Sequence, residues 1–300
     1  MQATDLRNLF LLASLWGSSF MFMRVAIDDF GPIPLIAMRV GISALFLLGV
    51  TLITHHGATI IAHWKAMAVA GVLNVVLPFL CLSYAVQTMM AGTLSIVNAM
   101  VPLFGGIIAW VWLRERLSWA RVLGLAIGFA GIVVLMLDKL SFVPGGEGWV
   151  VVIALGGPFF YGLGACHLSK YLRGVAPIAC ATGSMIAASI ILLPLALTRW
   201  PSTPISALSW GSVTCLAILC TGIAYLIFYR LVARVGASKS ITVTFLAPPF
   251  GVLWGVLLLD EPLTINVVMG ACIVLLGTLL ATGFIGGKAP RTEAPDANAQ

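Results

Sequence analysis

Charged residues are scarce in this chain of 300 residues. Asp, Glu, Lys and Arg together make up 9% of it, whereas an ordinary soluble globular domain carries about 25%. Hydrophobic residues make up 61%, and the mean hydropathy is +1.09. No polar stretch long enough for a soluble domain separates the apolar segments. This composition excludes a soluble globular protein and predicts an integral membrane protein.

The patterns of enzymes and of metal or cofactor sites are also missing. The sequence has no nucleophile–base motif, no glycine-rich phosphate loop and no carboxylate pair in its loops, so neither an enzyme nor a bound cofactor is expected. Its six cysteines form no CxxC pair and lie in apolar segments, where we interpret them as packing residues. His55, His56 and His63 lie close together, but no Cys, Asp or Glu joins them. No metal site is expected, because structural zinc needs four ligands.

Ten apolar segments of about 20 residues run through the chain, and each is long enough to cross the hydrocarbon core of a bilayer. The expected fold class is an all-α polytopic membrane protein with ten transmembrane helices. We expect a single transmembrane domain over 1–285 and a disordered cytoplasmic tail, polar and rich in Pro and Ala, over 286–300. The segments lie at about 8–27, 33–53, 66–86, 93–113, 120–137, 149–168, 177–197, 210–230, 240–259 and 266–285.

The second half of the chain repeats the first. At a constant shift of 146 residues, the thirty residues that begin at Pro102 match the thirty that begin at Pro248 at ten positions without a gap. The two repeats, about 8–138 and 149–285, contain five predicted helices each. Because five is an odd number, the second repeat enters the membrane from the opposite side, and the sequence predicts two inverted repeats.

Positive charges predict the orientation of the chain. With the N-terminus inside, twelve Lys and Arg fall at the cytoplasmic ends of the segments, two fall clearly at the outer side, and Arg24 and Arg39 lie near the outer ends of the first two segments. The ratio of twelve to two agrees with the positive-inside rule. Both termini are therefore expected to be cytoplasmic. The net charge of +6 is explained by this orientation and by lipid headgroups, so no nucleic-acid partner is expected.

Three membrane prolines, each four residues after a polar residue, are candidate hinges. Each removes the hydrogen bond to the carbonyl four positions earlier and kinks its helix, which lipid tolerates only where that carbonyl faces protein or water. The polar side chains either line a central cavity, where they bind a solute, or merely satisfy the kinked backbone. The pairs are Asn74 with Pro78, Asn98 with Pro102, and Thr244 with Pro248.

Four further side chains are candidates for a substrate site. Trp16 and Tyr161 correspond between the repeats at a shift of 145 residues and lie near the middle of their segments, not in the interfacial belt where such rings usually lie. The pair forms either the walls of a pocket for a partly apolar solute or part of the core. Ser19 lies one turn after Trp16, and Tyr225 lies in the middle of the eighth segment.

Two glutamates and one arginine near the ends of segments each have two interpretations. Glu115 and Glu261 correspond between the repeats, at segment ends on opposite sides of the membrane. They are either gates or helix-end latches or, for Glu115 between Arg114 and Arg116, a local ion pair of little net energy. Arg39 lies about one turn inside the second segment, where it either snorkels outward or attracts substrate.

Small residues recur at helical spacing in the last segment of each repeat: Gly124, Gly128 and Gly131 in the first, Gly270 and Gly277 in the second. They let helices approach closely in lipid. Packing within the chain is the favoured interpretation, with a dimer face as the alternative.

Several of these features together resemble a known family. The early Trp16-Gly17-Ser18-Ser19 and Arg39 belong to the pattern, and each repeat has a Pro-x-x-Gly followed by a Leu-x-Glu-x-Leu-like helix end and a glycine-spaced last segment. In these features the chain resembles the EamA-type ten-helix exporters of the drug/metabolite transporter superfamily, over about residues 7–285. The matching positions are Pro102, Gly105, Leu113, Glu115, Leu117 and Gly124 in the first repeat, and Pro248, Gly251, Leu259, Glu261, Leu263 and Gly270 in the second.

The resemblance implies a carrier that moves amino acids, their derivatives, other small metabolites or toxic compounds, usually outward across the bacterial inner membrane. Small multidrug-resistance relatives carry a membrane-embedded glutamate in their first span, and this chain has none there. No Asp or Glu lies between the ends of any segment, so we expect transport not to depend on an embedded carboxylate.

The sequence thus predicts a secondary transporter that exports a small organic metabolite by alternating access. A passive channel or facilitator and a membrane scaffold without transport are the alternatives. Inverted repeats with proline-broken helices favour the transporter because they supply two exchangeable arrangements around one site. The expected partners are a small-molecule substrate and membrane lipid, not nucleic acid, and the chain is expected to be a monomer or a homodimer.

Overall fold

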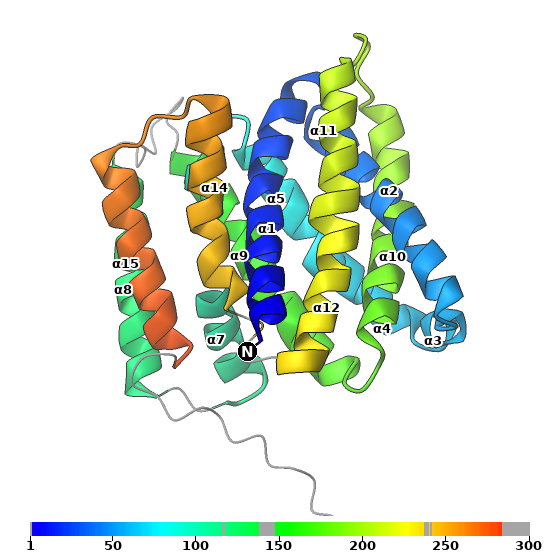
Figure 1. Cartoon of the computed structure of the whole chain (residues 1–300), viewed down its shortest axis with the longest axis horizontal. Helices are drawn as coiled ribbons and strands as arrows, with labels where there is room; N and C mark the ends of the chain where they lie inside the picture. Colours follow the sequence, from blue (N-terminus) through cyan, green and yellow to red (C-terminus); the bar gives the residue numbers. More distant parts are fainter. Residues whose placement is uncertain (1, 116–117, 138–147, 237–239, 241, 284–300) are drawn as a thin grey trace, which may run out of the picture.

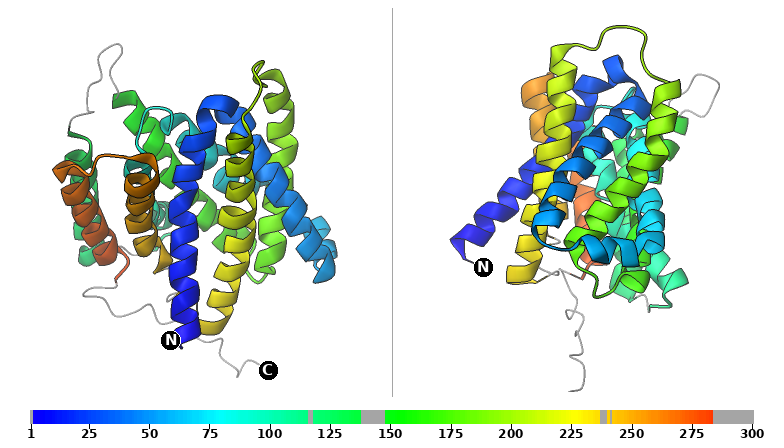
Figure 2. Two further views of the ribbon diagram at one scale, coloured as in Figure 1. Left: turned by 45° about the horizontal axis from the view of Figure 1, so that its top comes forward. Right: turned by 90° about the vertical axis from the view of Figure 1, so that its right-hand side faces the viewer.

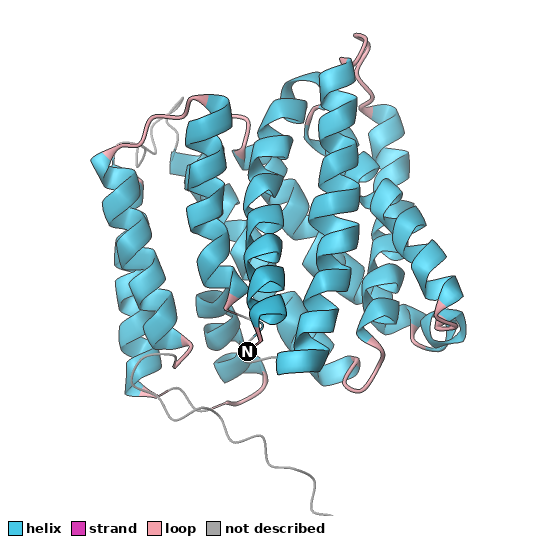
Figure 3. Cartoon of the chain, viewed as in Figure 1, coloured by secondary structure: helices cyan, strands magenta, loops and turns pink. Residues whose placement is uncertain are grey.

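The computed structural model of the chain describes residues 2–115, 118–137, 148–236, 240 and 242–283. Within these residues the chain forms helices joined by short connections, and it has no strand there (Figure 3). The all-α class predicted from the composition is confirmed for the described residues. The predicted tail at 286–300 lies outside them.

The first half of the chain forms its helices in the order in which the apolar segments were predicted. These are α1 (Ala3–Phe30), α2 (Pro32–Ile53), α3 (Gly57–Ala62), α4 (Trp64–Gly71), η1 (Val72–Val76), α5 (Leu77–Ala85), α6 (Ala91–Asn98), α7 (Val101–Trp112) and α8 (Trp119–Leu135). The second half forms α9 (Gly148–Tyr171), α10 (Pro177–Thr198), α11 (Ala207–Ala217), η3 (Ile218–Ile223), α12 (Ala224–Val235), α14 (Val243–Leu259) and α15 (Ile265–Ala281).

Seven helices among the described residues are long enough and apolar enough to cross a membrane, judged by length and composition. Two of the seven are composed of three consecutive elements, α4–η1–α5 and α11–η3–α12, and one consists of α6 and α7. Three shorter apolar helices, α8, α14 and α15, have 17 residues each. The chain is therefore an all-helical, multi-pass membrane protein.

Two long helices change to π-geometry at matching places. The π-segments η1 and η3 begin 146 residues apart, which is the shift that relates the two halves of the sequence. In the first, Pro78 lacks the N–H group that would bond to the carbonyl of Asn74, and η1 contains Asn74. The sequence analysis did not predict these segments. π-segments are often found at functional sites.

The other two candidate hinges differ from each other. The helix α6 ends at Asn98 and α7 begins at Val101, so the chain leaves helical geometry just before Pro102. In contrast, α14 continues through Pro248 and Pro249. Pro248 and Pro249 lie in the second turn of α14, and the helix continues beyond them to Leu259.

Glycines join the last helices of the two halves. At one edge of the molecule, α8 and α15 lie side by side (Figure 1). A β-carbon built at Gly131 would lie 2.7 Å from the backbone nitrogen of Val274, and one built at Gly270 would lie 2.6 Å from the β-carbon of Leu135. The early Gly124 in α8 packs against the last residue of α15, so the two helices are antiparallel. Packing within the chain, the favoured interpretation of these glycines, is confirmed.

A second pair of glycine contacts joins helices from opposite halves. A β-carbon built at Gly17 in α1 would lie 2.7 Å from the backbone nitrogen of Gly251 in α14. One built at Gly162 in α9 would lie 2.8 Å from the backbone nitrogen of Gly105 in α7. The two contacts involve corresponding residues of the two halves, so α1 packs on α14 as α9 packs on α7.

The helices α2 and α10 also pack against each other, at the edge opposite to α8 and α15 (Figures 1 and 2). Thr51, near the end of α2, shares a hydrogen bond of 2.7 Å with Thr182, near the start of α10. This contact makes the two helices antiparallel. The helices α1, α5 and α9 lie between the two edges (Figure 1). Most of the buried apolar side chains form one continuous core in the bundle.

Candidate functional site

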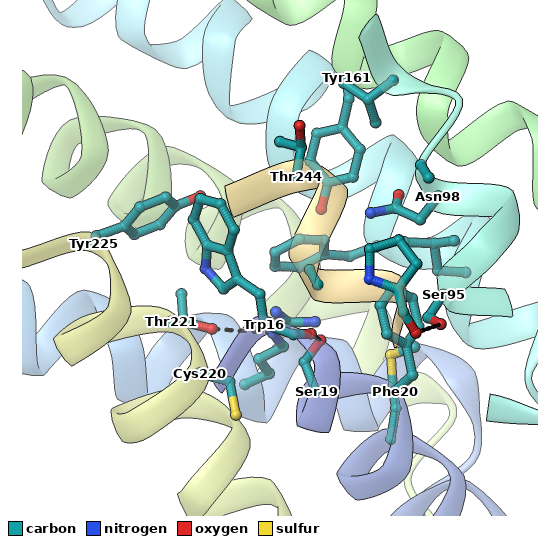
Figure 4. A pocket seen from close by; sticks show the side chains of 18 residues that line it. Trp16, Ser19, Phe20, Ser95, Asn98, Tyr161, Cys220, Thr221, Tyr225 and Thr244 are labelled. Atoms are coloured by element: carbon teal, nitrogen blue, oxygen red, sulfur yellow. Dashed lines mark hydrogen bonds between the residues drawn. The ribbon is translucent and has the colours of Figure 1, made fainter. Parts of the chain in front are cut away.

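A cavity of about 240 Å³ lies where helices of the two halves meet. Its walls come from α1, α2, α5, α6 and the residues that lead into α7 in the first half, and from α9, η3, α12 and α14 in the second. Figure 4 shows aromatic rings and polar side chains facing one another across it. The cavity is somewhat smaller than the pockets of about 300–1,000 Å³ that hold drug-sized ligands, so it suits a small solute.

The cavity gathers most of the side chains that the sequence analysis proposed for substrate binding. Pro248, one of the three candidate hinges, also contributes to its wall. The candidates that line it are Trp16, Ser19, Asn98, Tyr161, Tyr225 and Thr244.

Asn74 is the one substrate-site candidate that does not line the cavity, and the candidate hinges Pro78 and Pro102 do not line it either. The side chain of Asn74 packs against Gly164 of α9, where no β-carbon separates the two helices. Its Nδ2 is buried and has no hydrogen-bond partner among the described residues. The structure therefore places the Asn74 side chain at the interface between η1 and α9, and not in the lining of this cavity.

Three aromatic rings of the cavity are held in position by ring contacts behind them. Trp16 lies 5.4 Å from Phe228 between ring centroids, and Tyr161 meets Phe79 edge-on at 6.2 Å. Tyr225 stacks on Tyr229 at 5.9 Å with an interplanar angle of 9°. Such contacts add to the energy of burial and restrict the rings. The walls of the cavity are therefore rigid apolar surfaces from both halves.

Arg39 also lines the cavity, and its side chain is only 7% exposed. Its Nε donates a hydrogen bond of 3.2 Å to Oγ1 of Thr221 in η3. Its guanidinium carbon lies 3.8 Å from the centroid of the Phe79 ring, a cation–π distance. The interpretation that Arg39 snorkels to the membrane surface is therefore wrong. Its side chain points into the bundle, on the same face of α2 as Ile36 and Val40, which are fully buried.

A signal for the inward direction of Arg39 was present one turn further along α2. Ser43 is fully buried, and its Oγ lies 2.6 Å from the carbonyl oxygen of Arg39 and 2.9 Å from that of Ala217 at the end of α11. A polar residue four positions after an arginine marks a polar helix face, which lipid does not accommodate. In the π-segment η3, Thr221 Oγ1 donates a hydrogen bond of 3.0 Å to the carbonyl oxygen of Leu216, five residues earlier. The hydroxyl group of Thr221 therefore bonds to both Leu216 and Arg39.

The polar groups of α6 differ in how well they are satisfied. Ser95 Oγ lies 2.6 Å from the carbonyl oxygen of Gly92 in its own helix and 3.3 Å from that of Pro248 in α14. In contrast, Oδ1 of Asn98 is buried and has no hydrogen-bond partner among the described residues. A buried acceptor without a partner is unfavourable, and the cavity is where a bound solute can satisfy it.

At the end of the bundle where α1 finishes, Glu261 joins the two halves. Its Oε1 accepts a hydrogen bond of 2.5 Å from the backbone N–H of Ala91, and its Oε2 one of 2.9 Å from that of Gly92. These are the first two residues of α6, so the carboxylate caps a helix N-terminus, where negative charge is favoured. The contact connects the end of α14 with the start of α6.

The corresponding Glu115 has a different partner. One of its oxygens lies 3.7 Å from Nη1 of Arg121, and both side chains are partly exposed, so this ion pair contributes little. Glu261 and Glu115 therefore have different partners among the described residues. A further ion pair, at the end of the bundle where the N-terminus lies, joins Asp5 of α1 to Arg234 of α12 at 3.0 Å.

Comparison with known proteins identifies the family. The family model described as the EamA-like transporter family matches the chain twice, at residues 8–137 and 148–283. The chain belongs to the EamA-like transporter family. This membership, within the drug/metabolite transporter superfamily, confirms the resemblance found in the sequence motifs.

The relatives of this EamA-like chain are similar along nearly its whole length. The uncharacterized transporter YvbV of Bacillus subtilis is 27% identical over 93% of this chain and 92% of its own length. A probable terminal-alkyne amino-acid exporter of Streptantibioticus cattleyicolor is 25% identical over 96% of each. A solved crystal structure with 18% identity has a TM-score of 0.66 and covers 94% of this chain and 97% of its own, which shows the shared fold. The chain is therefore a membrane transporter, and no catalytic function is indicated.

Proposed function

We propose that this chain is a secondary transporter that exports a small organic metabolite, such as an amino acid or one of its derivatives, across the bacterial inner membrane by alternating access. The cavity between the two halves is its substrate site, and Trp16, Ser19, Asn98, Tyr161, Tyr225 and Thr244 contact the solute. The observation that carries the proposal is that corresponding residues of the two halves meet at this one cavity. Trp16 corresponds to Tyr161 and Asn98 to Thr244.

Two inverted repeats of five helices account best for the helix contacts. The antiparallel packing of α2 on α10 and of α8 on α15 is what corresponding helices adopt when a two-fold axis lies in the membrane plane. The paired contacts of Gly17 with Gly251 and of Gly162 with Gly105 obey the same axis. We therefore propose that α8, α14 and α15 also cross the membrane. Their 17 residues reach the lower limit of about 17–25 residues for a transmembrane helix.

Inverted repeats supply a physical basis for alternating access. If the two halves exchange conformations, the contacts at one end of the bundle are replaced by their counterparts at the other. The capping of α6 by Glu261 is a contact of this kind, and it fits one of these two states. Glu261 then acts as a latch for the end where α1 finishes.

The orientation proposed from the charge distribution places both termini in the cytoplasm. The end of the bundle where α1 finishes then faces outward. A single cysteine introduced in the loop at 138–147, in a variant without the native cysteines, is expected to react in intact cells with a membrane-impermeant maleimide. A single cysteine in the connection at 172–176 is expected to react only after the cells are opened. The reverse pattern would show that the orientation is wrong.

A flux measurement tests the proposed function against its alternatives. The purified chain is reconstituted in liposomes, and the initial rate of uptake of labelled amino acids and related metabolites is measured as a function of concentration. A carrier gives saturable uptake with at least one solute, because each solute must occupy the site. Uptake that rises linearly without saturation favours a channel, and the absence of flux with every solute favours a scaffold. The proposed transporter uses no cofactor. Coupling through a carboxylate in the cavity is not expected, since no Asp or Glu is among the described residues that line it.

A further inference from the structure

We infer that the central cavity binds its solute through a carboxylate group, and that Arg39 is the residue that pairs with this carboxylate. The inference rests on the proposed function, because it treats the cavity as the transport site. It narrows the solute to small organic acids, including amino and hydroxy acids, whose body lies between the aromatic walls. It also makes specific the alternative of the sequence analysis in which Arg39 attracts substrate, by naming the group of the solute that Arg39 binds.

The charge of Arg39 has no anionic partner among the described residues. Among the described residues that line the cavity, Arg39 is the only one that carries a full charge. Five acidic side chains in the described part of the chain have other partners at helix ends: Asp5 with Arg234, Asp28 with Arg24, Asp29 with Ser206, Glu115 with Arg121, and Glu261 with Ala91 and Gly92. A buried charge without a partner is strongly unfavourable, so the cavity is complementary to an anion.

The contacts of Arg39 leave most of its donors for such an anion. A guanidinium carries five N–H groups and cannot be deprotonated in a protein. Within the described part of the chain, the guanidinium group of Arg39 makes one hydrogen bond, from Nε to Thr221. It also lies over the face of the Phe79 ring. The two terminal nitrogens are the pair that binds a carboxylate through two parallel hydrogen bonds. Thr221 and Phe79 hold the guanidinium in a fixed plane and so prepare it for this geometry.

A second unpartnered group in the cavity defines the rest of the solute. Oδ1 of Asn98 is a buried acceptor without a partner and lies in the same lining as Arg39. It is able to accept a hydrogen bond from an amino or hydroxyl group of the solute. Since no carboxylate is among the described residues that line the cavity, an amino group meets neutral acceptors, such as this amide oxygen and the hydroxyl groups of Ser19 and Thr244, and the faces of aromatic rings. The cavity is therefore expected to distinguish solutes mainly by their anionic group.

The experiment compares acids with their amides, in which an uncharged carboxamide group replaces the carboxylate. Purified wild type is mixed with matched pairs, namely L-leucine with L-leucinamide, L-phenylalanine with L-phenylalaninamide, and 3-phenylpropanoate with 3-phenylpropanamide, and binding is measured by thermal stabilisation and by uptake in proteoliposomes. We expect at least one acid to bind about tenfold or more tightly than its amide, because charge-assisted hydrogen bonds are about twice as strong as neutral ones. This comparison needs no variant and therefore does not depend on how substitutions of Arg39 fold.

Substitutions assign the preference to Arg39. In Arg39→Gln, the acid is expected to lose its advantage of about tenfold, while 3-phenylpropanamide, which carries no charge, binds as in the wild type. Arg39→Lys is expected to keep part of the preference, since it keeps the charge without the planar pair of donors. Arg24→Gln is the matched control, because Arg24 is a partly exposed arginine of α1 that pairs with Asp28 outside this cavity, and it is expected to leave the preference unchanged.

Two results would overturn the inference without affecting the proposed function. One is that the wild type binds or transports amides as well as acids. The other is that Arg39→Gln weakens acid and amide equally, which is what a structural role through Phe79 and Thr221 predicts. A wild type that transports none of the solutes and no member of a wider panel of metabolites contradicts the transporter itself, so the two failures are distinguishable.

Discussion

The contact between Glu261 and the start of α6 allows a quantitative prediction about access to the cavity. Glu261→Gln keeps one acceptor oxygen but loses the charge and one of the two bonds to the backbone N–H groups of Ala91 and Gly92. A hydrogen bond to a charged group contributes about 1.5–3 kcal/mol. Glu261 is partly exposed, so we take the lower value of about 1.5 kcal/mol, which corresponds to about a tenfold change in an equilibrium constant. The end of the bundle that Glu261 closes is therefore expected to open about ten times more often.

The assay measures how fast a cysteine in the cavity reacts from outside. Val101 lines the cavity and is partly exposed, so Val101→Cys is introduced in a variant whose six native cysteines are replaced by Ala. Intact cells are treated with a membrane-impermeant thiosulfonate. The rate of modification is expected to rise about tenfold with Glu261→Gln, since the rate follows the fraction of open molecules.

The matched control is the corresponding glutamate of the other half. Among the described residues, Glu115 forms an ion pair with Arg121 in which both side chains are partly exposed, so Glu115→Gln is expected to change the rate from outside by less than about twofold. Equal modification rates in the wild type and in Glu261→Gln, with both proteins present in the membrane in equal amounts, would refute the role of Glu261 as a latch.

Three further substitutions test the packing of the two halves and the walls of the cavity. Gly17→Ala is expected to reduce thermal stability by about 1–3 kcal/mol, because its β-carbon would lie 2.7 Å from the backbone of Gly251. Gly41→Ala is its control, with nothing within 4 Å of the new atom, and equal stability of the two variants would contradict the close contact. Asn98→Leu is expected to preserve folding and to weaken solute binding by about 1–3 kcal/mol through the lost hydrogen bonds, and an unchanged apparent affinity in uptake assays would argue against a role in binding. Trp16→Ala is expected to enlarge the cavity and change the order of preference among solutes, measured by competition for uptake, and an identical order would mean that this wall does not select.

The sequence predicted the all-helical membrane fold and six of the eighteen residues that line the cavity, because both predictions depend on patterns that repeat. Apolar segments of sufficient length mark helices in a membrane regardless of their neighbours. The lining was found because residues that correspond between inverted repeats tend to meet at the axis that relates them, as Trp16 and Tyr161 do at one cavity. Neither inference needed the direction in which any single side chain points.

What the sequence did not predict depends on such directions. Arg39 was interpreted from its depth in the helix, whereas its burial follows from the face of α2 that it shares with Ser43. Asn74 was assigned to the cavity because a proline follows it by four residues, but the π-segment η1 turns it toward Gly164. A change of helical geometry over one turn rotates the side chains that follow, and the sequence contains no periodic signal for it.

Counterflow through the purified chain tests the central claim most directly. Proteoliposomes are loaded with a high concentration of an unlabelled solute that the chain transports, and a trace of the labelled solute is added outside. If one central site is exposed alternately to the two sides, the label accumulates transiently above its outside concentration, because returning carriers are mostly occupied by unlabelled solute. Entry of the label only up to the outside concentration, with no transient excess, would contradict alternating access at this cavity.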